Sequence, residues 1–246
     1  AHSIARATLE TGFGNTLVSG AIYTMTVSAT DAASNTATPV SNALITYDNV
    51  SPIISLVTPA ASSTVNAGLA VNYTLSEPVA SGTITFVRTN GTADASSHIY
   101  NFAVGDKTSG AHSVARATLE TGFGNTLVDG TIYTMTISAT DTASNAATPV
   151  SNTGITYDTT NPVISLVTPA TSSSVNGGFS ASYTLSEAAS SGTITFARTG
   201  GTADANPHTY NFVSGDETSG AHSIARAILE VGFGNTLVDG TIYTMT

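Results

Sequence analysis

The stretch TIYTMTISATD, residues 131–141, decides the class of fold. Tyr133, Met135, Ile137 and Ala139 alternate with threonine and serine. Because successive side chains of a strand point to opposite faces, this alternation places the apolar residues on one face and the polar residues on the other. The segment is therefore predicted to be a half-buried β-strand, with one face in a core.

The segments around this stretch have the same period of two. LAVNYTLSE places Val71, Tyr73 and Leu75 on one face, and GTITFVR does so with Ile84 and Phe86. Glycine, proline, asparagine and aspartate interrupt the chain at short intervals, and no segment shows a long period of 3.6 residues. About seven short strands fit between these turns. The sequence predicts an all-β fold, an antiparallel β-sandwich, with no helix.

The pattern is repeated along the chain. AHSIARATLETGFGNTLV begins at Ala1 and returns nearly unchanged at Ala111 and Ala221, a spacing of 110 residues. This period is longer than that of a solenoid repeat and fits a domain that buries its own core. The sequence thus predicts a tandem array: the C-terminal part of one domain in residues 1–48, a complete domain in 49–158, and a third domain without its last strand in 159–246.

One segment resembles a known family. TLVDGTIYTMTISATDTASN is similar to the late strand of fibronectin type III and bacterial Ig-like domains, with Leu127, Gly130 and Tyr133 at its Leu-x-x-Gly-x-x-Tyr places. The resemblance implies that the tyrosine hydroxyl bonds back to the backbone at a strand corner, and Tyr23 and Tyr243 repeat the position. Together with YDTTNP, the segment also resembles the tandem Ig-like repeats of large bacterial surface proteins and adhesins. This resemblance implies a scaffold at the cell surface or outside the cell.

Composition narrows the classes of partner. The chain of 246 residues has a net charge of −10 with only six lysines and arginines, which disfavours nucleic acid and anionic lipid. No stretch approaches the ~18 apolar residues of a membrane helix. Tryptophan is absent, so a tryptophan platform for stacking sugars is excluded. Neighbouring repeats of the same protein are the expected partners.

The expected function is a non-enzymatic structural repeat of an extracellular adhesin or filament, acting as a semi-rigid rod. Nearly identical copies serve length and multivalency, whereas catalysis needs one assembled pocket. Two alternatives stay open: a multivalent module that binds carbohydrate or protein, and a spacer of a larger secreted enzyme. We expect the chain to be a window of a longer array. Completion of the third domain by a strand from a neighbouring copy, as in fibres, is the other possibility.

The histidines do not form a catalytic pattern in the sequence. His112 and Ser113 are neighbours on an expected strand, so they point to opposite faces and are not a base and its nucleophile. His98 and His208 stand beside turn residues and are expected at the surface. No cofactor is expected from these residues.

The ends of the TITF strands and the GFGN segment are also expected to be structural. Arg88 and Arg198 are expected to cover apolar surface or to pair with a carboxylate such as Asp94 or Asp204. GFGN lacks the strand-to-helix context and the lysine of a phosphate-binding loop, so it is predicted to be a turn.

An acidic group is the one candidate site. In an Ig-like sandwich, the linker from the previous domain and two loops share one pole, and these hold Asp48, Glu77, Asp141 and Asn145. Calcium prefers six to eight oxygen ligands, so this pole is a candidate calcium site. The alternative is that the aspartates make turn hydrogen bonds and Glu77 stays solvated. The next junction repeats two of these residues, Asp158 and Glu187.

Overall fold

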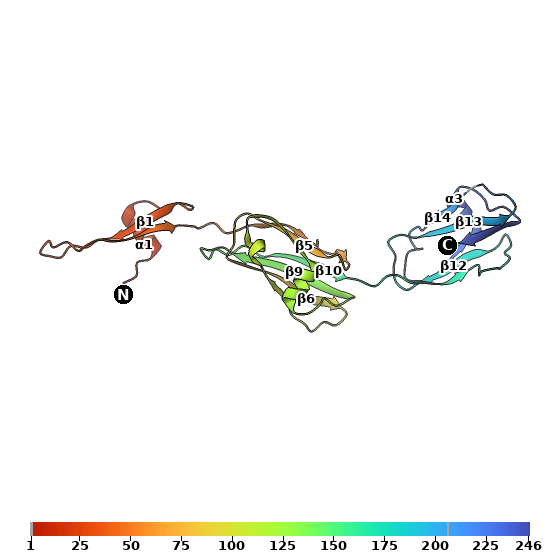
Figure 1. Ribbon diagram of the computed structural model, residues 1–246, viewed down its shortest axis with the longest axis horizontal. Coiled ribbons are helices and arrows are strands. Elements are labelled where there is room, and N and C mark those ends of the chain that lie inside the picture. The colour runs from red at the N-terminus through yellow and green to blue at the C-terminus, as the bar shows by residue number, and fades with distance from the viewer. Residues whose placement is uncertain (1, 206) are drawn as a thin grey trace. The chain divides into compact units, whose positions relative to one another are not determined.

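The computed structural model describes residues 2–205 and 207–246 (Figure 1). The chain divides into two compact units, with the boundary between Thr159 and Thr160. Both units are mostly β and consist of several sheets in which nearly all strand pairs are antiparallel, so the all-β class is confirmed. The predicted domain boundaries stay predictions. None of the helices in the described part of the chain is long and apolar enough to cross a membrane.

The first unit begins with a helix and a two-stranded sheet and continues into two larger sheets. The early elements are α1 (Arg6–Phe13), β1 (Ile22–Val27) and β2 (Val40–Thr46). The later elements are β3 (Ile54–Thr58), β4 (Thr64–Val65), β5 (Ala70–Leu75), β6 (Ser81–Gly91), β7 (His98–Asn101), the 3₁₀ turn η1 (Val104–Lys107), β8 (Gly110–Ala115), α2 (Arg116–Phe123), β9 (Thr131–Thr140) and β10 (Val150–Tyr157).

The two larger sheets of this unit enclose one core. One sheet has the strand order β3-β5-β8 and the other β4-β10-β9-β6-β7. Strands β6 and β9 pair with Ile84 opposite Ile137 and Phe86 opposite Met135. The predicted inward residues of β5, β6 and β9 are all buried in this core: Val71, Tyr73, Leu75, Ile84, Phe86, Tyr133, Met135, Ile137 and Ala139.

The second unit repeats most of this arrangement. Its elements are β11 (Ile164–Thr168), β12 (Ser180–Leu185), β13 (Thr193–Gly201), β14 (His208–Asn211), β15 (Gly220–Ala225), α3 (Arg226–Phe233) and β16 (Thr241–Met245). The sheets have the orders β11-β12-β15 and β14-β13-β16. Their core contains Tyr183, Leu185, Phe196, Ile224 and Leu229.

The prediction of a chain without helices is wrong. The segment RATLETGF forms α2, and the same segment forms α1 and, as RAILEVGF, α3. Leu119 is the only residue of α2 that is fully buried, so a helix of two turns leaves no visible period in the sequence. The GFGN segment contains the end of this helix. Gly124 has a φ of +72° and its N–H donates to the carbonyls of Glu120 and Thr121.

Strands β3 and β11 stand at the ends of their sheets and carry an unusual leucine. Leu56 has a φ of +50° and Leu166 a φ of +52°, in the left-handed region that side chains rarely adopt. The pairing of β3 with β5 is irregular between Ser55 and Thr58, and β11 has the same irregularity. Both leucine side chains are exposed. Each of these end strands therefore contains a bulge.

Candidate functional site

Three carboxylates from separate loops meet in the first unit. Asp48 follows β2, Glu77 follows β5 and Asp141 follows β9. One ligand oxygen of each lies within 4.8 Å of the others. Asn145 lies beside them, because its Nδ2 donates to Asp141 Oδ2 at 2.8 Å and to the backbone oxygen of Asp48 at 3.3 Å. The structure thus brings together the four residues that the sequence placed at this pole.

Two of these carboxylates also make the turn bonds that were the alternative interpretation. Asp141 Oδ1 accepts from the backbone N–H of Asn145 at 2.8 Å, and Asp48 Oδ1 accepts from that of Val50 at 3.0 Å. Burial works against the charged form of Asp141, but the hydrogen bonds from Asn145 outweigh it and lower the pKa of Asp141. The turn bonds of the two aspartates are therefore compatible with metal binding, since each carboxylate has a second oxygen or further lone pairs. The other part of that interpretation, a solvated Glu77, is wrong, because Glu77 Oε1 is buried.

Glu77 differs from the two aspartates. Its Oε1 is buried and has no hydrogen-bond partner among the described residues. Burial raises the pKa of Glu77, and the negative charges of Asp48 and Asp141 raise it further. A divalent cation placed among the three carboxylates would supply the missing partner and neutralise the repulsion. Three carboxylates and nearby carbonyl and amide oxygens form the donor set that calcium prefers.

The second predicted pair of metal ligands is not placed as a site. Asp158 belongs to the first unit and Glu187 to the second. Glu187 Oε1 is buried without a hydrogen-bond partner in the described part of the chain, like its counterpart Glu77. The calcium prediction for Asp158 and Glu187 stays a prediction.

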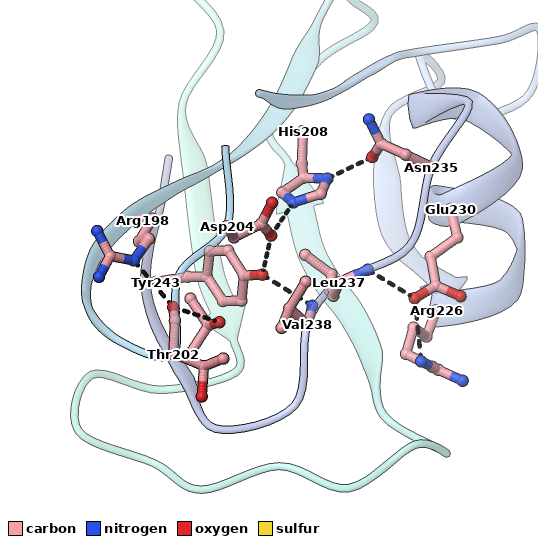
Figure 2. Close-up of polar contacts among 11 residues, drawn as sticks. Arg198, Thr202, Asp204, His208, Arg226, Glu230, Asn235, Leu237, Val238 and Tyr243 are labelled. Carbon is pink, nitrogen blue, oxygen red and sulfur yellow. Dashed lines mark hydrogen bonds and ion pairs between the residues drawn. The ribbon is translucent and has the colours of Figure 1, made fainter. Parts of the chain in front are cut away.

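A buried polar network in each unit was not predicted. In the second unit, His208 Nε2 lies 2.7 Å from Asp204 Oδ2, and the hydroxyl of Tyr243 donates to the same oxygen (Figure 2). The backbone N–H of Val238 donates to this hydroxyl at 2.9 Å, and Asn235 Oδ1 contacts His208 Nδ1. The tyrosine thus makes the backbone bond that the resemblance implied, and it also binds a carboxylate.

The first unit contains the same aspartate, histidine and tyrosine contacts, but His98 Nδ1 and Asn125 Oδ1 have no hydrogen-bond partner among the described residues. His98 Nε2 and the Tyr133 hydroxyl both lie 2.6 Å from Asp94 Oδ2, and Val128 N–H donates to Tyr133 at 2.9 Å. The rings of Tyr133 and Phe123 pack against His98 with centroids 5.7 and 5.2 Å away. The network therefore connects the loop after β6 to β7, β9 and the end of α2.

The prediction that His98 and His208 lie at the surface is wrong, because each is only 1% exposed. In HIY and HTY the histidine stands two residues before Tyr100 or Tyr210, so it shares the inward face of its strand. This alternation was the signal in the sequence. The turn residues directly before each histidine favoured a surface position, so this alternation was not used.

Electrostatics show what the network does. Burial alone would raise the pKa of Asp94, but hydrogen bonds from Tyr133, His98 and the N–H of Ser96 outweigh burial and lower this pKa to about 2. Burial, followed by the neighbouring carboxylate, raises the pKa of Tyr133 to about 12. Asp94 is thus held as a carboxylate and Tyr133 as a phenol. The arrangement pins a loop and offers no accessible base.

The arginines bind the backbone. Arg88 donates from Nε to the Thr92 carbonyl and from Nη2 to the Gly91 carbonyl, each at 2.8 Å. The Asp94 carboxylate instead binds Tyr133 and His98. The expectation that Arg88 pairs with Asp94 is therefore wrong. Arg198 makes the corresponding two bonds, to Thr202 and Gly201.

The start of each helix contains an ion pair that sequence reasoning missed. Arg116 Nη1 lies 2.7 Å from Glu120 Oε2, and Glu120 Oε1 accepts from the Leu127 N–H at 3.2 Å. Figure 2 shows the counterpart, in which Arg226, Glu230 and Leu237 make the same contacts. The spacing of four residues between arginine and glutamate in a helix was the available signal.

His112 is on strand β8, as expected, with Ser113 on the other face. Its Nε2 lies 2.7 Å from the Thr108 carbonyl, and its ring stacks on Tyr73.

No protein-family model and no curated protein sequence matches the chain.

Proposed function

We propose that the chain is made of tandem Ig-like structural repeats of an extracellular surface adhesin or filament, and that these repeats act as a semi-rigid rod. The observation that carries the proposal is that one internal framework is repeated. Asp94, His98 and Tyr133 of the first unit make the same contacts as Asp204, His208 and Tyr243 of the second. A chain that repeats its framework in this way extends its length without adding a new site.

The use of polar residues supports this proposal. Residues of the types that often act in catalysis make internal bonds in this chain. His98 and Asp94 do so in a buried network, and Arg116 and Glu120 do so at the start of a helix. The members of each pair are four residues apart, and each pair is tied to a distant segment: the Tyr133 hydroxyl donates to Asp94, and Arg116 Nε donates to the carbonyl of Ala67. Such cross-links resist separation of strands, which is the property that a rod under tension requires.

Stretching single molecules of the full chain by its ends tests the proposal. We expect residues 49–158 to unfold in one abrupt step, with a length gain of about 3.3–3.6 Å per released residue less the folded span. Gradual extension without a distinct step would contradict a mechanical role. Saturable binding of a defined glycan or protein by the same chain would favour the binding module, and co-purification with a catalytic domain would favour the spacer.

A calcium-binding junction is the second candidate, and the buried, unpartnered Oε1 of Glu77 favours it. We propose that calcium binds Asp48, Glu77 and Asp141 and stiffens the first unit at this pole. Binding to the folded state alone would raise the unfolding free energy by about 2.7 kcal/mol when calcium is at a hundred times its Kd.

Calcium titration of the full chain, followed by thermal unfolding and by isothermal calorimetry, tests this site. Glu77→Gln should abolish the heat of binding and the stabilisation. Glu217→Gln removes one carboxylate elsewhere and should leave both intact. Equal responses of the two variants would show that calcium acts only by general screening of the acidic chain.

A further inference from the structure

The turn after β6 contains an asparagine followed by glycine, Asn90 and Gly91, in an unusual arrangement. The backbone N–H of Gly91 donates to Oδ1 of Asn90, the side chain immediately before it, at 2.9 Å. Because Oδ1 is bonded to Cγ, the same contact holds the Gly91 nitrogen beside the carboxamide carbon. Asn90 is exposed, so water reaches this group.

The pairing of β6 with β9 leaves this nitrogen out of the ladder. Gly91 stands opposite Thr131, and the next residue, Thr92, donates its N–H to the Gly130 carbonyl at 3.0 Å. In an antiparallel ladder this bond makes Gly91 and Thr131 a non-hydrogen-bonded pair, so the Gly91 N–H points away from β9. Strand β7 pairs with β6 only over residues 83–86. The side chain of Asn90 therefore remains the hydrogen-bond acceptor of the Gly91 N–H.

Glycine is required at position 91, and the turn around it is ordered. Gly91 has a φ of +72°, and an added Cβ would lie 2.2 Å from the Gly130 oxygen. Arg88 holds the carbonyls of Gly91 and Thr92. The nitrogen is thus unshielded by a side chain and fixed in place, which lowers the entropy cost of an intramolecular reaction.

We propose that Asn90 and Gly91 form a site of spontaneous backbone modification, in which the Gly91 nitrogen attacks Asn90 Cγ. The Gly91 amide loses its proton to water or hydroxide, and a bond forms between the nitrogen and Cγ. The bond from Cγ to Nδ2 breaks, and Nδ2 leaves as ammonia with a proton from water. The product is a five-membered succinimide ring, which water opens at either carbonyl to give aspartate or isoaspartate.

The chain contains a second asparagine–glycine step that is arranged differently. The Oδ1 of Asn176 accepts from the N–H of Gly178, two residues on, at 2.9 Å. That bond closes a turn in which the carboxamide oxygen binds the N–H of Gly178, whereas Asn90 binds the N–H of the glycine directly after it. The residue that corresponds to Asn90 in the next repeat is Gly200, which has no carboxamide. The arrangement that favours reaction at Asn90 is therefore absent from the corresponding turn of the next repeat.

The modification changes the turn that carries Arg88. Aspartate at position 90 adds a negative charge, and isoaspartate adds one backbone methylene between residues 90 and 91. The added atom shifts the pairing of Asn90 with Ile132 and of Gly91 with Thr131. The end of the pairing between β6 and β9 thus loosens with the age of the molecule in one repeat, while the next repeat stays unchanged.

Incubation of the folded full chain at pH 8 tests the proposal. Trypsin cleaves after Arg88 and Lys107, so peptide 89–107 reports Asn90, and a separate peptide, 117–198, reports Asn176. We expect conversion of Asn90 at least about tenfold faster than conversion of Asn176, which a barrier difference of about 1.4 kcal/mol supplies. Mass spectrometry measures the amide-to-acid change, and chromatography separates aspartate from isoaspartate.

Two controls make the result decisive. In Asn90→Gln the ring would have six members, and in Asn90→Gly the residue of the next repeat is introduced; both should abolish the reaction in peptide 89–107. The same chain in urea should convert both asparagines at similar rates. If Asn90 converts no faster than Asn176 in the folded chain, or more slowly than in urea, the turn protects Asn90 and the proposal is wrong.

Discussion

Strands β1 and β9 have almost the same sequence, but different surroundings decide whether their apolar face is buried. Met135 of β9 is fully buried, whereas its counterpart Met25 in β1 is 48% exposed. Strand β9 belongs to a five-stranded sheet that shares a core with the sheet β3-β5-β8, whereas β1 pairs with β2 alone in the described chain. The sequence of a strand sets which face is apolar, and the opposite sheet supplies the burial.

The side-chain hydrogen bonds are the same in the β1–β2 hairpin and in the β9–β10 hairpin. Thr26 Oγ1 lies 2.7 Å from Ser41 Oγ, and Thr136 Oγ1 lies 2.8 Å from Ser151 Oγ. The N–H of Val18 donates to the Tyr23 hydroxyl at 2.9 Å, as Val128 does to Tyr133. The hairpin bonds are therefore formed without a core. They set the register, and burial of the apolar face adds most of the stability.

The largest expected difference is between Tyr133→Ala and Tyr23→Ala. Loss of the fully buried ring of Tyr133 should cost about 3–5 kcal/mol of unfolding free energy. The change at Tyr23, which is partly exposed, should cost less than about 1 kcal/mol. Urea unfolding of the full chain followed by far-UV circular dichroism measures both. Equal costs would mean that pairing, and not the facing sheet, stabilises these strands.

The loss of unfolding free energy in acid should also differ between the two regions, by a smaller amount. The pKa of Asp94 is about 2 in the folded chain against an ordinary value of 3.8, so its contribution of about 2 kcal/mol is complete above pH 4. It is lost as the pH falls from about 4 towards 2. Asp94→Asn should flatten this part of the stability profile.

Asp31 in the hairpin loop is the matched control for the acid experiment. The hydrogen bonds from Asn35 also lower the pKa of Asp31, but this residue is exposed. Asp31→Asn should leave the pH profile of unfolding nearly unchanged. If the two substitutions change the pH profile of unfolding equally, the buried network is not the source of the acid sensitivity.

The smallest expected effect concerns one backbone position. Leu44 of β2 has a φ of +60°, where the corresponding residue of β10 is Gly154 with a φ of +73°. Gly154→Leu should cost about 1–2 kcal/mol, because left-handed backbone is unfavourable for a residue with a Cβ. Leu44→Gly should stabilise by less than about 1 kcal/mol, since the relief of strain is partly offset by the greater freedom of glycine in the unfolded chain.

Thermal unfolding of the two single variants and of the double exchange checks this position. The two effects should add, because the positions lie in different strand pairs. Destabilisation by Leu44→Gly would show that the exposed leucine is held by contacts that its φ alone does not reveal.

The strand pattern was accessible from the sequence because alternation is a local property. Tyr73 and Phe86 were placed correctly in the core, since each has apolar neighbours two residues away. The meeting of Asp48, Glu77 and Asp141 followed from assigning them to loops at one pole. The first inference needed only the period of the strand, and the second also used the loop arrangement of an Ig-like sandwich.

The remaining features depended on contacts between segments distant in sequence. Helix α2 is short, and Leu119 is its only fully buried residue, so its period was not detectable. The burial of His98 depends on Asp94 and Tyr133, which approach from a loop and from another strand. A buried polar residue is placed by its partners, and a single sequence does not state which partners meet.

The bulges at Leu56 and Leu166 have a consequence for the folding of the two units. Adjacent domains with nearly identical sequences are prone to exchange strands during synthesis, because each presents its neighbour with a matching edge. Flat edges promote such exchange and aggregation, and a bulge interrupts the regular row of donors and acceptors. Each copy of β3 carries its own interruption, between Ser55 and Thr58 and between Ser165 and Thr168. The strained leucine thus favours separate folding of the two units, whose sequences are nearly the same.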